Sequence, residues 1–168
     1  PLAGMVNASI SGTLRMDGDK AVPEARADIA LDDMQFGTAK TKSIRMAGYL
    51  MGDVAKIEKL EAIEGDTNLS AEATLGPADA LAVRVDAHNL SMDTLRQWVR
   101  LPNNFSGNAD VTVVAGGSRT SPTSEAYVEI VNPIIGGAKF DRLRSRLAAG
   151  KPDENGRVNI NDLTLTLD

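Results

Sequence analysis

Few residues in this chain could carry out chemistry, and they are scattered. His88 is the only histidine among 168 residues, and there is no cysteine. Zinc sites that need two histidines or thiolates are therefore excluded. His88 follows the polar positions of LAVRVDAH, which indicates an ordinary histidine at a strand end rather than a catalytic base. The sequence contains no match to the motifs of phosphate-binding loops or nucleophile elbows.

Several carboxylates lie in short polar segments typical of turns, such as Asp17 and Asp19 in DGDK and Asp153 and Glu154 in PDEN. Calcium binds several oxygen ligands supplied by one loop, but no segment matches the EF-hand pattern. We interpret these acids as solvated turn residues. The sequence thus predicts no catalytic residue, no metal site and no cofactor, and the chain is not expected to be an enzyme.

Composition excludes further classes of protein. The net charge is −5, with acidic and basic residues interspersed, which argues against nucleic-acid binding because phosphate contacts need clustered Lys and Arg. No apolar run is long enough to predict a membrane-spanning helix. The chain begins at Pro1 without a signal-peptide pattern, and we expect it to be a fragment of a longer protein.

The strongest pattern is an alternation of apolar and polar residues. VNASISGTLRM, residues 6–16, alternates without interruption, which is typical of a half-buried strand. The same period recurs in ARADIAL, SIRMAGYL, LAVRVDA and NADVTVVA, and turn sequences separate the segments. About ten short strands are expected, and an all-β fold follows.

Two kinds of irregularity interrupt the alternation. Ile57–Leu60 and Ile160–Leu163 each shift the apolar phase by one residue, which predicts a β-bulge in both strands. Residues 89–102 instead place Met92, Leu95 and Val99 at helical spacing, with Ser91 as the N-cap and Pro102 as the end. One short helix is predicted there.

A long internal repeat relates the two halves of the chain. Residues 23–45 and 122–144, separated by 99 residues, are identical at six of 23 positions, and their apolar positions also agree. We infer two copies, at about 6–75 and 107–168, joined by a strand and the short helix at about 81–102. A repeat of this length indicates an architecture that itself repeats.

These patterns predict an elongated, curved antiparallel sheet, taco-like or solenoid-like, with an apolar inner face. If that face lines a groove, it can shield acyl chains; a closed β-sandwich would bury the same face against a second sheet. A groove for unfolded β-strands is a third possibility. The candidate groove residues are Ile10, Leu14, Ile29, Leu31, Ile44, Met46, Leu69, Val83, Val85, Val111, Val113, Val128 and Ile130.

The chain resembles the TamB family of translocation and assembly proteins, within the wider AsmA-like group. The resemblance rests on SGNADVTVVAGG at 106–117, EAYVEIVNPIIGG at 125–137 and GRVNINDLTL at 156–165. The linking phrase LAVRVDAHNLSMDTLRQWV, 81–99, also resembles that family's connection between a strand and a short helical segment. The resemblance covers nearly the whole chain, and its motifs consist of alternation, glycines and turns.

The resemblance implies a fold and a role. It implies a long sheet curled around an apolar groove, in the periplasm of bacteria with two membranes, in a parent protein anchored in the inner membrane by a helix that this chain lacks. It implies phospholipid acyl chains as ligands, in lipid transport and outer-membrane biogenesis. It also implies a partner, an outer-membrane barrel protein of the BamA-like class. No catalytic residue is implied.

Overall fold

A computed structural model describes residues 2–36, 39–96, 103–118, 121–152 and 158–168, and side chains are described for most of these. The chain forms β1 (Leu2–Asp17), β2 (Lys20–Phe36), β3 (Ala39–Met51), β4 (Val54–Glu64), β5 (Thr67–Leu75), β6 (Ala80–Ser91), β7 (Phe105–Ser118), β8 (Ser121–Ile135), β9 (Ala138–Lys139), β10 (Arg142–Pro152) and β11 (Val158–Leu167). A 3₁₀ turn at Pro77–Asp79 and the helix α1 (Met92–Arg96) complete the described elements. No helix in the described part is long and apolar enough to cross a membrane.

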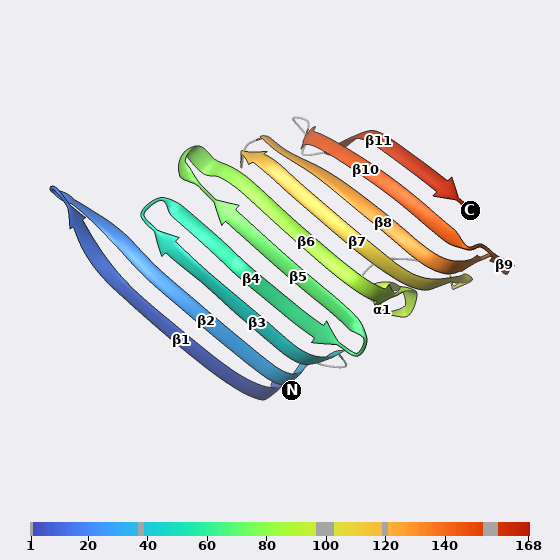
Figure 1. Ribbon diagram of the computed structural model, residues 1–168, viewed down its shortest axis with the longest axis horizontal. Coiled ribbons are helices and arrows are strands. Elements are labelled where there is room, and N and C mark those ends of the chain that lie inside the picture. The colour runs from blue at the N-terminus through green and yellow to red at the C-terminus, as the bar shows by residue number, and fades with distance from the viewer. Residues whose placement is uncertain (1, 37–38, 97–102, 119–120, 153–157) are drawn as a thin grey trace.

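All strands belong to one open antiparallel sheet. Each strand pairs with the next along the chain, in the order β1-β2-β3-β4-β5-β6-β7-β8-β10-β11, and the short β9 pairs with β8 (Figure 1). The predicted all-β antiparallel sheet with one short helix is confirmed. Sequential pairing makes the sheet a meander. The described residues contain no second sheet that could close a sandwich.

Both predicted bulges are present. The pairing of β4 with β5 shifts register between Ile57 and Leu60, so the extra residue lies in β4. The pairing of β10 with β11 shifts where Ala148 faces Asp162 and Ala149 faces Ile160, which leaves Asn161 as the extra residue. An extra residue keeps the apolar side chains on one face after the phase of the sequence has changed.

A further pair of bulges lies at positions related by the repeat. Asp33 in β2 and Asn132 in β8, which are 99 residues apart, both have φ of +50°. Opposite them, Gly4 and Gly107 have φ of +140° and +133°, where only glycine is comfortable. A Cβ on Gly107 would approach Ile130 Cγ2 to 2.9 Å. Glycine is therefore needed at both sites for backbone conformation and for space.

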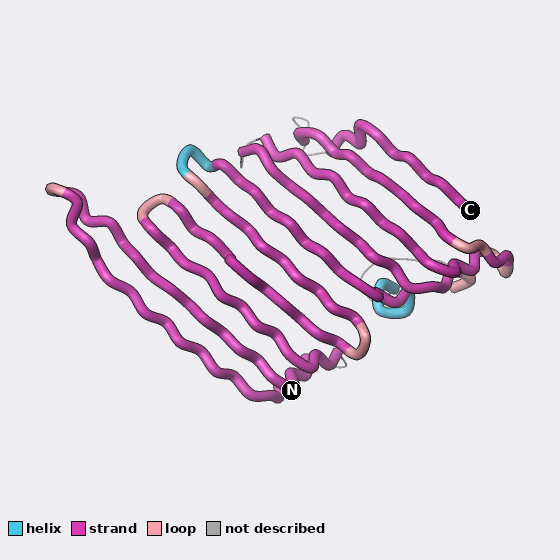
Figure 2. The backbone as a smooth tube through the Cα atoms, in the orientation of Figure 1, coloured by secondary structure: helices cyan, strands magenta, loops and turns pink. Residues whose placement is uncertain are grey.

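The helix α1 begins where predicted. The backbone N–H of Thr94 donates to Ser91 Oγ at 3.0 Å, which is the predicted N-cap bond. The helix is also held from its side, because the Arg96 guanidinium donates to the carbonyl of Phe105. Figure 2 shows this single turn of helix at one end of the strands, after β6. Val99 and Pro102, which the prediction placed in the second half of the helix, lie outside the described residues.

A small cluster of buried residues lies under α1, and Met34, Ala87 and Leu90 are buried outside it. Met92 (2% exposed) packs against Ala109 (0%), Ile130 (3%) and Leu143 (8%), with Leu95 and Phe105 at the margin. These sheet residues are cross-strand neighbours on β7, β8 and β10. Only this end of the sheet has a second layer in the described part of the chain.

Candidate functional site: an uncovered apolar sheet face

The candidate site is the face of the sheet that the apolar positions share. Residues directly opposite one another in an antiparallel pair point to the same face, so the strand register assigns each side chain to a face. Tracing the register across the sheet gives rows of cross-strand neighbours. The central row contains Ala8, Ile29, Met46, Leu60, Ala71, Val85, Val113, Ala126 and Leu147.

The rows on either side are almost as apolar. One contains Val6, Leu31, Ile44, Ala62, Leu69, Ala87, Val111, Val128, Ser145 and Leu165. The other contains Ile10, Ala27, Gly48, Ile57, Ala73, Val83, Ala115, Ser124 and Ala149. Two serines are the only polar side chains in the three rows, and no charge or aromatic ring interrupts them. With strands about 4.8 Å apart, each row extends for about 40 Å.

All thirteen candidate groove residues lie on this apolar face. The register places the strands' apolar positions together even across the bulge in β4, where Met46 faces Leu60 and Gly48 faces Ile57. Ile130 differs from the other twelve because it is 3% exposed and packs in the cluster under α1. It is therefore closed to a ligand while the helix is in place, which the alternation alone could not indicate.

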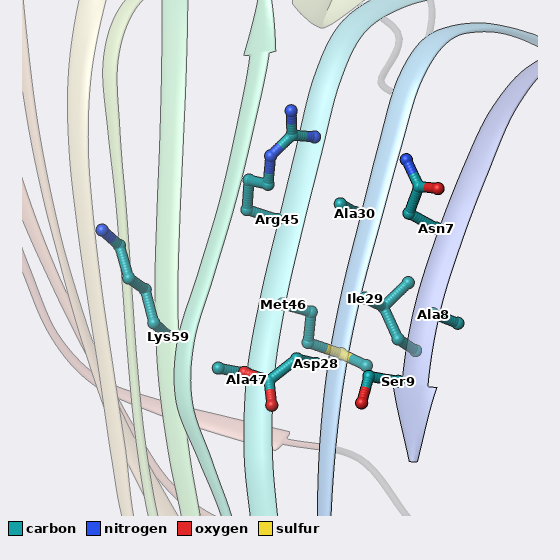
Figure 3. A pocket seen from close by; sticks show the side chains of 10 residues that line it. All are labelled: Asn7, Ala8, Ser9, Asp28, Ile29, Ala30, Arg45, Met46, Ala47 and Lys59. Carbon is teal, nitrogen blue, oxygen red and sulfur yellow. The ribbon is translucent and has the colours of Figure 1, made fainter.

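Exposure rises toward the N-terminal edge of this face. In β1, Val6, Ile10 and Leu14 are 60%, 77% and 67% exposed, whereas candidates on the inner strands are half-buried by their neighbours. Figure 3 shows the Met46 side chain reaching from β3 toward Ile29 on β2, its cross-strand partner. Neighbouring aliphatic side chains thus form a nearly continuous apolar surface.

The opposite face is charged and is tied together by ion pairs. The Arg84 guanidinium donates to both carboxylate oxygens of Asp86, at 2.7 and 2.9 Å, and the Thr112 hydroxyl donates to Asp86 at 2.6 Å. These bonds lower the pKa of Asp86, with the Arg84 bond as the largest cause and the Thr112 bond next. Arg84 and Thr112 occupy polar positions of the alternating segments LAVRVDA and NADVTVVA, and they lie on this charged face.

A second cluster of the charged face joins β8 to the C-terminal edge. The Tyr127 hydroxyl donates to Glu125 at 2.5 Å, and Arg146 donates to the same carboxylate at 3.2 Å. The pKa of Glu125 is lowered by the Tyr127 bond first and by Arg146 second. Arg146 also lies 3.7 Å from Asp162 on β11. These contacts hold neighbouring strands in register and bring no nucleophile or base together.

The surface hollows of the described sheet lie mainly on its charged face. The one in Figure 3, about 460 Å³, is lined by residues of β1 to β4 that include Asn7, Asp28, Arg45 and Lys59. A groove on the apolar face, as in a taco-like sheet, stays a prediction.

His88 is exposed, with Nδ1 3.6 Å from Asp110. In the described part, no three His, Cys, Asp or Glu side chains gather in a way that could hold a metal ion.

Comparison with known proteins adds no relative to this description. No known protein family, curated protein or solved structure matches the chain. The candidate site is therefore defined by its geometry alone: an amphipathic sheet with one charged face, one aliphatic face and a helix over one end of the aliphatic face.

Proposed function

We propose that this chain is a non-enzymatic segment of a bacterial envelope protein whose apolar face binds phospholipid acyl chains. The observation that carries the proposal is the set of aliphatic rows, which run from β1 to β10 and which, among the described residues, have a second layer only at α1. Water is a poor solvent for such a surface, so a ligand that covers it is favoured.

The chemistry of the face suits a flexible hydrocarbon chain. Its side chains are mostly aliphatic and small, and in the three rows only Ser124 and Ser145 offer hydrogen-bond donors, which is too little to select a particular head group. Each methylene that such a face removes from water contributes about 0.8 kcal/mol. An acyl chain can therefore be held at many positions along the rows, as lipid transport between membranes requires.

The family resemblance supplies the biological setting of the proposal. The resemblance to TamB-like and AsmA-like proteins implies a periplasmic location, inter-membrane lipid transport and a role in outer-membrane biogenesis. It also implies a BamA-like barrel protein as partner of the parent chain. No comparison supports this setting independently, so the lipid-binding test below examines the face itself.

The test is photo-crosslinking along β6, where successive side chains change face. A photoreactive amino acid is placed in turn at Ala82, Val83, Arg84 and Val85, and lipid adducts are detected in cells. We expect adducts at 83 and 85, which lie on the apolar face, and none at 82 and 84. Equal labelling of both faces, or no labelling of a folded protein, would contradict the proposal.

A matched pair of substitutions tests the same face without a photoreactive amino acid. Val85→Gln and Arg84→Gln introduce the same residue at adjacent positions on opposite faces. We expect Val85→Gln to weaken the binding of a fluorescent fatty acid and Arg84→Gln to leave it unchanged. If the two variants bind alike, the apolar face is not the lipid site.

A strand-binding chaperone is the second candidate function. The specific observation that favours it is that no described strand pairs with the outer side of β1, because extended peptides bind proteins by adding a strand to such an edge. The crosslinking experiment separates the two functions, since a chaperone would give peptide adducts in place of lipid adducts.

A further inference from the structure

The row that α1 covers is continuous with the rows proposed to bind acyl chains. Ala109, Ile130 and Leu143 are cross-strand neighbours on β7, β8 and β10. Two residues away on their strands, Val111 and Val128 face each other in the adjoining row and pack against the covered cluster. On β7 and β8 no polar side chain separates the two rows. The helix therefore occupies part of the aliphatic face itself.

Among the described residues, the cover depends mainly on one side chain. Met92 is the only buried residue of α1, whereas Leu95 is half-buried and Asp93 is exposed. Methionine is unbranched and has three rotatable bonds, so its side chain resembles a short piece of hydrocarbon chain in shape and polarity. Met92 thus occupies a place on the sheet that an acyl chain would fill if the helix were displaced.

The strand that leads to α1 is anchored independently of the helix. β6 stays paired with β7 as far as Ser91, which faces Asn108. Just before it, Asn89 has φ of +55°, and its backbone N–H donates to the Asp110 carboxylate at 2.9 Å. The Asn89 side-chain amide also donates to the carbonyl of Asp66, at 3.2 Å. Movement of α1 therefore needs no change in the strands beneath it.

The helix depends on contacts outside itself. It spans five residues, and a helix this short is not stable in isolation. It is held by the cap bond from Thr94 to Ser91, by the bond from the Arg96 guanidinium to the Phe105 carbonyl and by the burial of Met92. An acyl chain that replaced Met92 would restore the apolar contacts of the sheet, whereas opening into water would leave them exposed. Displacement by such a ligand is therefore less costly than spontaneous opening.

We propose that α1 is an autoinhibitory cover that acyl chains displace, and that Met92 is the side chain that competes with them for the row of Ala109, Ile130 and Leu143. The inference rests on the proposed lipid-binding function and adds the regulation of that site. While the face is empty, Met92 keeps this row dry. When lipid fills the adjoining row at Val111, its chain competes with Met92, and the accessible face widens by one row.

Methyl NMR of the wild-type protein follows the open face and the cover separately. The first probe is stearate that carries a nitroxide spin label, which broadens the signals of methyl groups that it approaches. We expect Ile44, a half-buried residue of the open rows, to broaden first and Ile130 to broaden at higher stearate concentration. With unlabelled stearate, the Met92 methyl signal should move to that of an exposed methionine over the same concentration range as the Ile130 response.

The outcomes separate this inference from the proposed function. Broadening of Ile44 without any response of Ile130 or Met92, up to saturation, would overturn the displaceable cover and leave lipid binding in place. If neither isoleucine broadens, the lipid-binding function fails and the inference fails with it. Broadening of Ile130 while Met92 keeps its buried signal would show that lipid enters beside a fixed helix, which also overturns the inference.

A variant with a weakened cap tests the competition without changing the apolar face. Ser91→Ala removes the cap hydroxyl, so it should lower the stearate concentration at which Ile130 responds by up to about five-fold. The midpoint for Ile44 should not change, and Ser11→Ala, on the charged face of β1, should shift neither midpoint. An unchanged Ile130 midpoint in a Ser91→Ala variant that circular dichroism shows to be folded would overturn the inference.

The same substitution at two methionines should have opposite effects. Met92→Ser removes the competing side chain, so Ile130 should respond at a lower stearate concentration than in the wild type. Met46→Ser removes apolar contact from an open row two residues from Ile44 on β3, so Ile44 should respond at a higher concentration. A shift to higher concentration at both sites would show that Met92 supports lipid binding, and the cover would not be autoinhibitory.

Discussion

Two corresponding rows of the sheet differ in their cover: α1 lies over one of them. Val6, Leu31 and Ile44 are cross-strand neighbours on β1, β2 and β3, and Ala109, Ile130 and Leu143 occupy the corresponding places on β7, β8 and β10. Leu31 is half-buried, whereas Ile130 is 3% exposed. Both residues have a paired strand on each side, so the greater burial of Ile130 comes from the helical turn that follows β6.

This difference separates two tasks that one face can perform. Under α1, apolar residues form a dry core that stabilises the sheet. In the corresponding row on β1 to β3, Val6 is exposed and Leu31 and Ile44 are half-buried, so a ligand or a partner could bury them further. The amphipathic sheet therefore provides both core and binding surface, and the local cover determines which of them a given row becomes.

The largest effect on stability is expected from truncating a side chain in the row that α1 covers. Ile130→Ala should lower the free energy of unfolding by about 2–4 kcal/mol, because it leaves a cavity beneath Met92. Leu31→Ala, 99 residues earlier, should cost about half as much because Leu31 is only partly buried. Urea unfolding of both variants measures the comparison. Equal losses would mean that α1 does not stabilise its row.

A smaller effect is expected from loosening the cover itself. Ser91→Ala removes the hydroxyl that caps α1 and should cost about 1 kcal/mol. Hydrogen exchange should become faster at Ala109 and Ile130 while Leu31 and Ile44 keep their wild-type rates. Ser11→Ala, on the exposed face of β1, is the control. Faster exchange in both rows would show that the helix stabilises the whole sheet.

The smallest effect concerns the opposite, charged face. Because the Arg84 and Thr112 hydrogen bonds lower the pKa of Asp86 in the folded protein, this carboxylate stabilises the fold above the ordinary Asp range. That contribution is lost as the pH falls through the lowered pKa. Arg84→Gln should raise the pKa of Asp86 toward its ordinary value, which carboxyl NMR titration measures. An unchanged pKa would show that Arg84 is not the main cause.

Local pattern was sufficient to predict much of this fold. Alternation around Val83 and Val85 predicted the apolar face, the phase change between Ile57 and Leu60 predicted a bulge, and Ser91 predicted the start of a helix. Each of these signals lies within a few residues of the structure it describes, where side-chain period and backbone geometry are directly linked.

Features that depend on distant residues were not predicted. The burial of Ile130 requires Met92 to fold back over β8, and the pKa of Asp86 depends on Thr112, which is 26 residues away. Alternation cannot report such contacts, because it assigns a residue to a face without saying what covers that face. The same limit left the closed sandwich open as an alternative until the strand pairing was known.

Sequential strand order also has a consequence for how the protein forms. Most strands from β2 onward pair with the strand just completed, and β10 pairs with β8 across the short β9, so most closing loops are short and their entropic cost is small. The sheet can therefore grow by one strand at a time as the chain emerges from a ribosome or a translocation channel, before its C-terminal part exists. Assembly in this order pairs each new edge with the following strand almost as soon as that edge appears.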